Sequence, residues 1–164
     1  MPKKTIVDAI NAQINREFNA AYFYLSMSAH FENQNLPGFA RWMRLQHDEE
    51  VSHAMRFFDF LYDIGGSVTL QAVKKPTATW SSAKAVMRDA LKHEKGVSKA
   101  INGLYALALK EKDYPAQVHL QWFVTEQVEE EKAVGDILAK MERAGDSGHA
   151  LLLMDRELGA RANG

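Results

Sequence analysis

Four long stretches of this sequence carry a stripe of side chains that recurs every three or four residues, and this spacing constrains the fold more than any other feature. Residues three and four positions apart share one face of an α-helix, so each stretch is predicted to form an amphipathic helix. The predicted helices cover about residues 4–33, 38–64, 82–112 and 114–143. The stripe of the second stretch consists of Phe39, Met43, Gln46, Glu50, His53, Phe57, Leu61 and Ile64.

The composition favours an all-α fold and excludes several classes of function. Gly and Pro are sparse, with 10 and 4 residues in a chain of 164, and long stretches are filled with good helix formers. The chain has no cysteine, which excludes disulfides and thiolate zinc sites, so a metal would be bound by oxygen and imidazole. A net charge of −1 gives no basis for nucleic-acid binding.

The beginning of the chain and its hydropathy indicate where the protein works. The N-terminus lacks the apolar run of a signal peptide, and no window approaches the length of a membrane span. We therefore expect a cytoplasmic protein with no membrane partner.

The breaks between the stretches predict the topology. A tight turn at residues 33–38 should lay the second helix antiparallel to the first. Gly65-Gly66 ends the second helix, and about 16 residues without helical periodicity follow, enough to run the length of a helix. We predict one domain over residues 1–164: an antiparallel four-helix bundle (about 4–143) with a long crossover between helices 2 and 3, and a short fifth helix (about 148–160).

Each of the four stripes is interrupted near its middle by polar side chains. The interrupting residues are Glu17, Glu50, His53, Glu94, Gln127 and Glu130. The midpoints of the helices in a bundle lie at one level, so these groups are predicted to converge in the core. One acid on a stripe is ordinarily a solvated side chain, whereas four buried carboxylates would repel one another unless cations neutralise them or they bind protons. The pattern therefore indicates a metal centre.

The spacing fits two metal ions. Glu17, Glu50 and His53 would hold one, while Glu94, Glu130 and the far oxygen of Glu50 would hold the other. Oxygen-rich sites with one imidazole suit iron or manganese. Each ion would keep open positions, and adjacent iron ions with open positions can bind dioxygen, which indicates redox chemistry rather than hydrolysis.

Other polar and aromatic residues leave alternatives open. Tyr24 lies on the stripe of Glu17 and could hydrogen-bond to a ligand or donate an electron, or could simply pack in the core. Calcium or zinc binding without redox chemistry, and a bundle with no catalytic role, also remain open. We expect surface or interface positions for His30, His47, His93, His119 and His149.

The whole chain resembles the non-haem bacterial ferritins. The matching residues are Glu17 within Arg-Glu-Phe-Asn, Tyr24, Glu49, Glu50, His53, Glu94, Gln127 and the run Glu129-Glu130-Glu131. The resemblance implies a ferroxidase with two irons per subunit: dioxygen or hydrogen peroxide oxidises Fe(II), and the Fe(III) mineral fills a shell of 24 identical subunits. It also implies that the fifth helix packs around the fourfold axes of the shell. A third iron site, formed by Glu49, Glu126 and Glu129 and sharing Glu130, is implied as well.

The chain departs from related families at two places. Rubrerythrins, bacterioferritins and di-iron oxidases repeat Glu-x-x-His on a second helix, whereas this chain has Gln127-x-x-Glu130. We expect this change to weaken the second site, which suits iron as a substrate. Bacterioferritins carry a haem-binding Met where Val51 stands, so we expect no haem. The alternatives are a di-iron oxidase or rubrerythrin-like peroxidase that retains its iron as a cofactor, and a DNA-protecting mini-ferritin.

Overall fold

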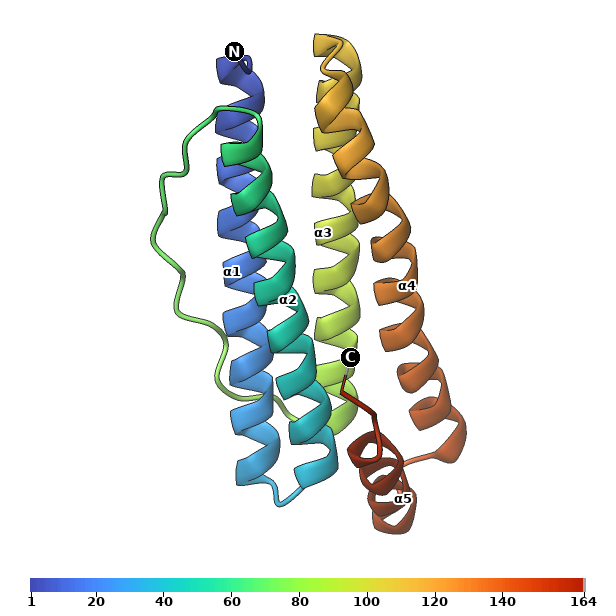
Figure 1. The fold of residues 1–164 in the computed structure, drawn as a ribbon. Helices are drawn as coiled ribbons and strands as arrows, with labels where there is room; N and C mark the ends of the chain where they lie inside the picture. Colours follow the sequence, from blue (N-terminus) through green and yellow to red (C-terminus); the bar gives the residue numbers. More distant parts are fainter. Residues whose placement is uncertain (164) are drawn as a thin grey trace.

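The computed structural model describes residues 1–163 and consists of five helices: α1 (Lys4–Asn33), α2 (Pro37–Asp63), α3 (Ala83–Glu111), α4 (Tyr114–Ala144) and α5 (Gly148–Gly159). No strand occurs in that range. Figure 1 shows α1 and α2 antiparallel, and a crossover that runs outside the bundle from the end of α2 to the start of α3. Helices α2 and α3 are therefore parallel, which confirms the predicted all-α architecture and its crossover.

Polar side chains fix where two of the long helices begin. The Ser82 hydroxyl accepts a hydrogen bond from the backbone N–H of Ala85 at 3.0 Å, and the Asp113 carboxylate accepts one from Ala116 at 3.0 Å. These bonds satisfy backbone donors that have no partner within the first turn. Ser82 is therefore the N-cap of α3, and Asp113 is the N-cap of α4.

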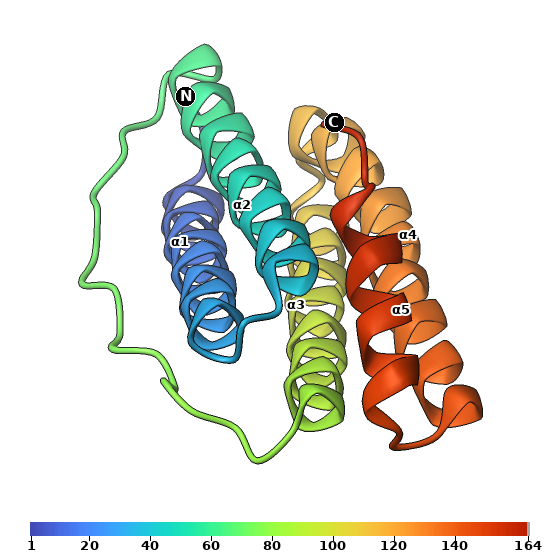
Figure 2. The ribbon, with the colours of Figure 1, turned by 90° about the horizontal axis from the view of Figure 1, so that it is seen from below.

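The start of α2 is capped by a residue far away in the sequence. No local side chain caps this helix, and the backbone N–H of Phe39 instead donates to the carboxylate of Asp155 in α5 at 2.9 Å. A Cβ on Gly38 would lie 1.7 Å from the carbonyl oxygen of Asp155, so only glycine permits this approach. Helix α5 is thereby fixed against the beginning of α2, as Figures 1 and 2 show.

The core consists of two apolar clusters with a polar layer between them. One cluster lies towards α5 and includes Phe31, Phe39 and Met87; the other lies towards the opposite end and includes Ile10 and Phe57. Nearly all of the predicted stripe positions are buried. Among residues 1–163, none of the five helices combines the length and the apolar character that a membrane span requires.

Side chains of α1 hold the crossover to the bundle. Three asparagines, each one turn after the last, bond to its backbone over distances of 2.7–3.1 Å. The pairs are Asn11 with Ser67 and Thr69, Asn15 with Ala72, and Asn19 with Lys74. The crossover, which lies to one side of the helices in Figure 2, thus depends on side-chain bonds rather than on regular secondary structure.

Candidate metal centre

The polar layer brings together side chains from all four long helices. The six residues that interrupt the stripes are buried: Glu17, Glu50, His53, Glu94, Gln127 and Glu130. Each sits where its helix would otherwise present an apolar side chain, with apolar clusters on both sides. Burying this many ionisable groups is unfavourable unless charge or hydrogen bonding compensates it.

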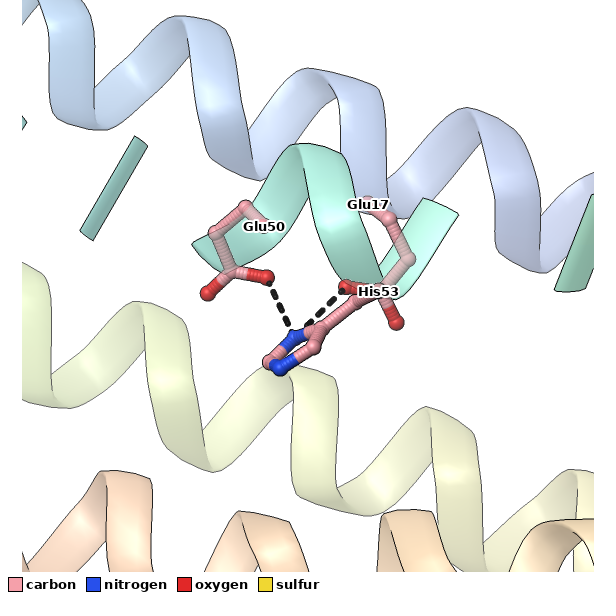
Figure 3. A group of neighbouring side chains, drawn as sticks. All are labelled: Glu17, Glu50 and His53. Atoms are coloured by element: carbon pink, nitrogen blue, oxygen red, sulfur yellow. Dashed lines mark hydrogen bonds and ion pairs between the residues drawn. The ribbon is translucent and has the colours of Figure 1, made fainter. Parts of the chain in front are cut away.

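The α1–α2 half of the layer contains polar atoms without partners. His53 Nδ1 lies 3.1 Å from Glu50 Oε2 and 4.0 Å from Glu17 Oε2, and Figure 3 shows the two carboxylates flanking the imidazole. Glu17 Oε2 and Glu50 Oε1 are buried and accept no hydrogen bond. Glu17, Glu50 and His53 each offer a ligand atom within 4.8 Å of the others. A divalent cation would satisfy these atoms.

The α3–α4 half differs, because both oxygens of Glu94 accept hydrogen bonds and no buried carboxylate oxygen there is without a partner among the described residues. The Tyr24 hydroxyl donates to Glu94 Oε1 at 2.5 Å, and the Gln127 amide donates to Glu94 Oε2 at 3.2 Å. Glu130 Oε2 accepts from the Gln46 amide at 2.9 Å. Gln127 thus directs its nitrogen towards Glu94, an arrangement that orients the carboxylate.

Two glutamines that were not predicted as site residues also donate hydrogen bonds to carboxylates of the layer. The amide of Gln13 donates to Glu17 Oε1 at 2.8 Å, and Gln46 bonds to Glu130. Gln13 precedes Glu17 by four residues, and Gln46 precedes Glu50 by four. A glutamine one turn before Glu17 and another one turn before Glu50 were therefore the signal in the sequence, although the Gln46 amide donates across the layer to Glu130.

Burial raises the pKa of the carboxyl groups in the layer. The pKa of Glu50 is raised well above its usual range by burial and then by the neighbouring Glu94 and Glu17. Burial also raises the pKa of Glu94, although hydrogen bonds from Tyr24 and Gln127 oppose this. Burial, followed by repulsion from Glu94, raises the pKa of Glu130 to about 9. Cation binding would therefore displace protons from these groups.

Burial and nearby acids also affect the tyrosine of the layer. The pKa of Tyr24 is raised well above its usual value, first by burial and then by the charge of Glu94. Tyr24 is therefore a neutral hydroxyl that donates to Glu94.

The three acids beside the layer, Glu49, Glu126 and Glu129, are called the outer carboxylates below, and the structure places them differently. Glu126 Oε1 lies 3.8 Å from His53 Nε2, and these two residues form a second group of possible ligands with Glu130. Glu49 Oε1 instead accepts a hydrogen bond from Arg161 at 2.8 Å. Glu129 is exposed. Of the three, only Glu126 belongs to a group of ligand atoms in the described residues.

Among the remaining histidines, the predicted surface or interface position is wrong for one. His30 is buried, with its ring 5.3 Å from that of Trp80, rather than on the surface. His119 stacks on Phe60 with ring centroids 4.1 Å apart, and burial lowers its pKa to about 4. Aromatic neighbours explain both positions, since an imidazole packs well against other rings.

Comparison with known proteins places the chain in a family. The profile of the family described as "Ferritin-like domain" matches residues 7–144. The bacterial non-heme ferritin of Escherichia coli O6:H1 is 36% identical over 158 residues, covering 96% of each chain. That of Bacteroides fragilis is 37% identical over 161 residues, covering 98% of this chain and all of the relative. A crystal structure of an open pore ferritin from Archaeoglobus fulgidus superposes with a TM-score of 0.97 at 43% identity, covering 99% of both chains. The chain belongs to the ferritin family, which confirms the resemblance read from its sequence.

Proposed function

We propose that this chain stores iron and that its polar layer oxidises Fe(II). One observation carries the proposal: inside an otherwise apolar core, Glu17 Oε2 and Glu50 Oε1 accept no hydrogen bond, and both residues lie beside the imidazole of His53. Buried carboxylate oxygens without hydrogen-bond partners are unfavourable, and a bound cation would stabilise them. The relatives named non-heme ferritins support iron as that cation.

Two Fe(II) ions would bind in the layer as substrate. Glu17, Glu50 and His53 Nδ1 hold the first ion. Glu94 and Glu130 hold the second, and Glu50 bridges the two ions because Oε1 is free while Oε2 faces His53. Gln127 orients Glu94 rather than binding strongly itself.

The oxidation follows from the pairing of the two ions. Each Fe(II) gives one electron, and dioxygen takes up two electrons and two protons to become hydrogen peroxide. Hydrogen peroxide as oxidant takes up two electrons and two protons to become two water molecules. Fe(II) binding releases protons from carboxyl groups whose pKa is raised, so protons become available beside the oxidant.

The oxidised iron would leave the layer for a mineral. We propose that the third site, formed by the outer carboxylates and Glu130, lies on this route. We also propose that 24 copies of the chain, each a single domain in the cytoplasm, form the shell around the mineral. Leu152 and Leu153 of α5 are 62% and 55% exposed, and contacts between copies would cover them.

The experiment begins with metal-free protein and anaerobic Fe(II). On admission of oxygen we expect a fast phase of about two Fe(II) per chain, followed by continued growth of a mineral in a large assembly on size exclusion. Glu94→Ala should abolish the fast phase while the shell still assembles. Glu32→Ala, a change at an exposed acid of α1, is the matched control.

Two results would contradict the proposal. A small oligomer whose iron stays fixed at about two per chain, with no mineral, would support a di-iron oxidase or rubrerythrin-like peroxidase that retains its iron. A fast phase left intact by Glu94→Ala would remove Glu94 from the site.

A further inference from the structure

The segment after α5 places an arginine beside the metal centre. Figure 1 shows this segment turning back from α5 towards the middle of the bundle. The Arg161 guanidinium donates to Gln46 Oε1 at 2.7 Å and to Glu49 Oε1 at 2.8 Å. It also lies 4.9 Å from the ring centroid of Trp42. One cation thus contacts an outer carboxylate and an amide of the polar layer.

Contacts on both sides of Arg161 hold it in this position. The Arg41 side chain donates to the carbonyl oxygen of Arg161 and to Asn163 Oδ1, both at 2.9 Å. On the other side, Asp155 caps α2 through Phe39. The guanidinium is therefore placed by the docking of α5 and not by a chance contact of a mobile side chain.

Arg161 also determines how Gln46 faces the metal centre. A guanidinium has only donors, so the Gln46 oxygen must point towards Arg161 and its nitrogen must point away. That nitrogen donates to Glu130 Oε2 at 2.9 Å. The side chains of Arg161, Gln46 and Glu130 therefore form one polarised row of hydrogen bonds.

We propose that Arg161 is a built-in cation that competes with metal for Glu49 and, through Gln46, holds Glu130 in its metal-free position. The inference rests on the proposed function, because it concerns the third site of that centre. Arginine keeps its charge at any working pH, so only displacement of the side chain can free Glu49. Arg161 is thus a positioning residue that weakens the third site.

The test measures binding of redox-inert Zn²⁺ to the metal-free assembly by calorimetry. Arg161→Gln should leave the first equivalent nearly unchanged and tighten the third about fivefold, as expected for a partly exposed ion pair. Because Glu130 also belongs to the second position, the second equivalent should tighten by a smaller factor. Arg161→Lys keeps a positive charge but loses the two parallel donors of the guanidinium. Its affinity for the third Zn²⁺ should lie between those of the unaltered protein and Arg161→Gln. Arg156→Gln, at an exposed arginine of α5, is the matched control and should change nothing.

A double-mutant cycle assigns the effect to Glu49. Glu49→Gln should weaken the third equivalent, and Arg161→Gln added to it should give no further tightening. A purely structural role would lower the thermal midpoint without changing Zn²⁺ affinity, and that result overturns the inference. If neither the unaltered protein nor any variant binds the first two Zn²⁺ equivalents, the proposed function is overturned instead. The two failures are therefore distinguishable.

Discussion

The two halves of the polar layer contain similar carboxylates but differ in which carboxylate oxygens accept hydrogen bonds. In the α1–α2 half, Glu17 Oε2 and Glu50 Oε1 accept no hydrogen bond, so a cation can bind these two oxygens without displacing a hydrogen-bond donor. In the α3–α4 half, both oxygens of Glu94 already accept hydrogen bonds from Tyr24 and Gln127. A metal there must compete with bonds worth about 1 kcal/mol each. The α1–α2 half therefore offers free oxygens to an ion, whereas in the α3–α4 half an ion must first break hydrogen bonds.

The difference arises from one pair of residues on α4. An amide at position 127 can donate to Glu94, whereas a glutamate there could only accept and would repel it. A carboxylate at Glu130 likewise accepts from Gln46, whereas a metal-binding imidazole would present a lone pair to the ion. Gln127-x-x-Glu130 thus satisfies hydrogen bonds of the metal-free α3–α4 half, and we expect it to lower the affinity for a second ion.

The largest expected effect is a fall in the thermal midpoint of the metal-free protein as the pH rises. It tests whether the hydrogen bonds of the α3–α4 half, which satisfy its oxygens, also compensate for buried charge. A carboxyl whose folded pKa is raised stabilises the fold fully below its unfolded pKa of about 4.5, and this contribution is lost as the pH rises towards the folded pKa. For Glu130 that pKa is about 9. We expect the thermal midpoint of the metal-free protein to fall by about 10 °C between pH 5 and 9.

The stability of metal-loaded protein should depend less on pH than that of metal-free protein. A cation favours the charged carboxylates, so Zn²⁺-loaded protein should lose little stability over the same pH range. Glu130→Gln should reduce the slope of the metal-free protein, because the amide does not titrate. A thermal midpoint that rises with pH in metal-free protein would show that the hydrogen bonds do compensate for the charge.

The next effect separates the two halves by mutation. Glu17→Ala removes a ligand from the open half and should weaken the first Zn²⁺ by about 100-fold or more, since a charged ligand is lost from a buried site. Glu94→Ala should leave the first Zn²⁺ nearly unchanged and weaken the second. Equal losses from both variants, measured by calorimetry, would mean that the halves bind as one unit.

The smallest effect comes from making the halves alike. The double variant Gln127→Glu with Glu130→His introduces Glu-x-x-His on α4 and removes the hydrogen bond from Gln127 to Glu94, while the one from Tyr24 remains. It should tighten the second Zn²⁺ about tenfold and slow iron release after oxidation. Val128→Ala, at an exposed position of the same helix, is the control. Unchanged affinity in the double variant would mean that the asymmetry of α4 is not what limits the second site.

Local patterns predicted the fold, whereas contacts between distant residues were not predictable. The stripes alone indicated the four long helices, and the polar positions on them indicated which side chains would be buried together. The cap from Asp155 to Phe39 and the pair of Arg161 with Glu49 join residues 116 and 112 positions apart, and no periodicity reports such contacts. His30 was expected at the surface or an interface because it lies off the stripe near the end of its helix. Its aromatic partner, Trp80, lies in a segment without periodicity, so the sequence did not indicate this contact.

The crossover has a consequence for how the chain tolerates change. Its backbone is bonded to side chains of α1, three asparagines and Ser26, and within the described part of the chain residues 67–81 make no hydrogen bond to the backbone of a helix, so a change in its length need not alter any helix. Lengthening such a connection is inexpensive, because doubling a flexible loop adds only about 0.6 kcal/mol of closure entropy. The stretch between α2 and α3 is therefore where an inserted peptide could be carried on the bundle without disturbing the carboxylates inside it.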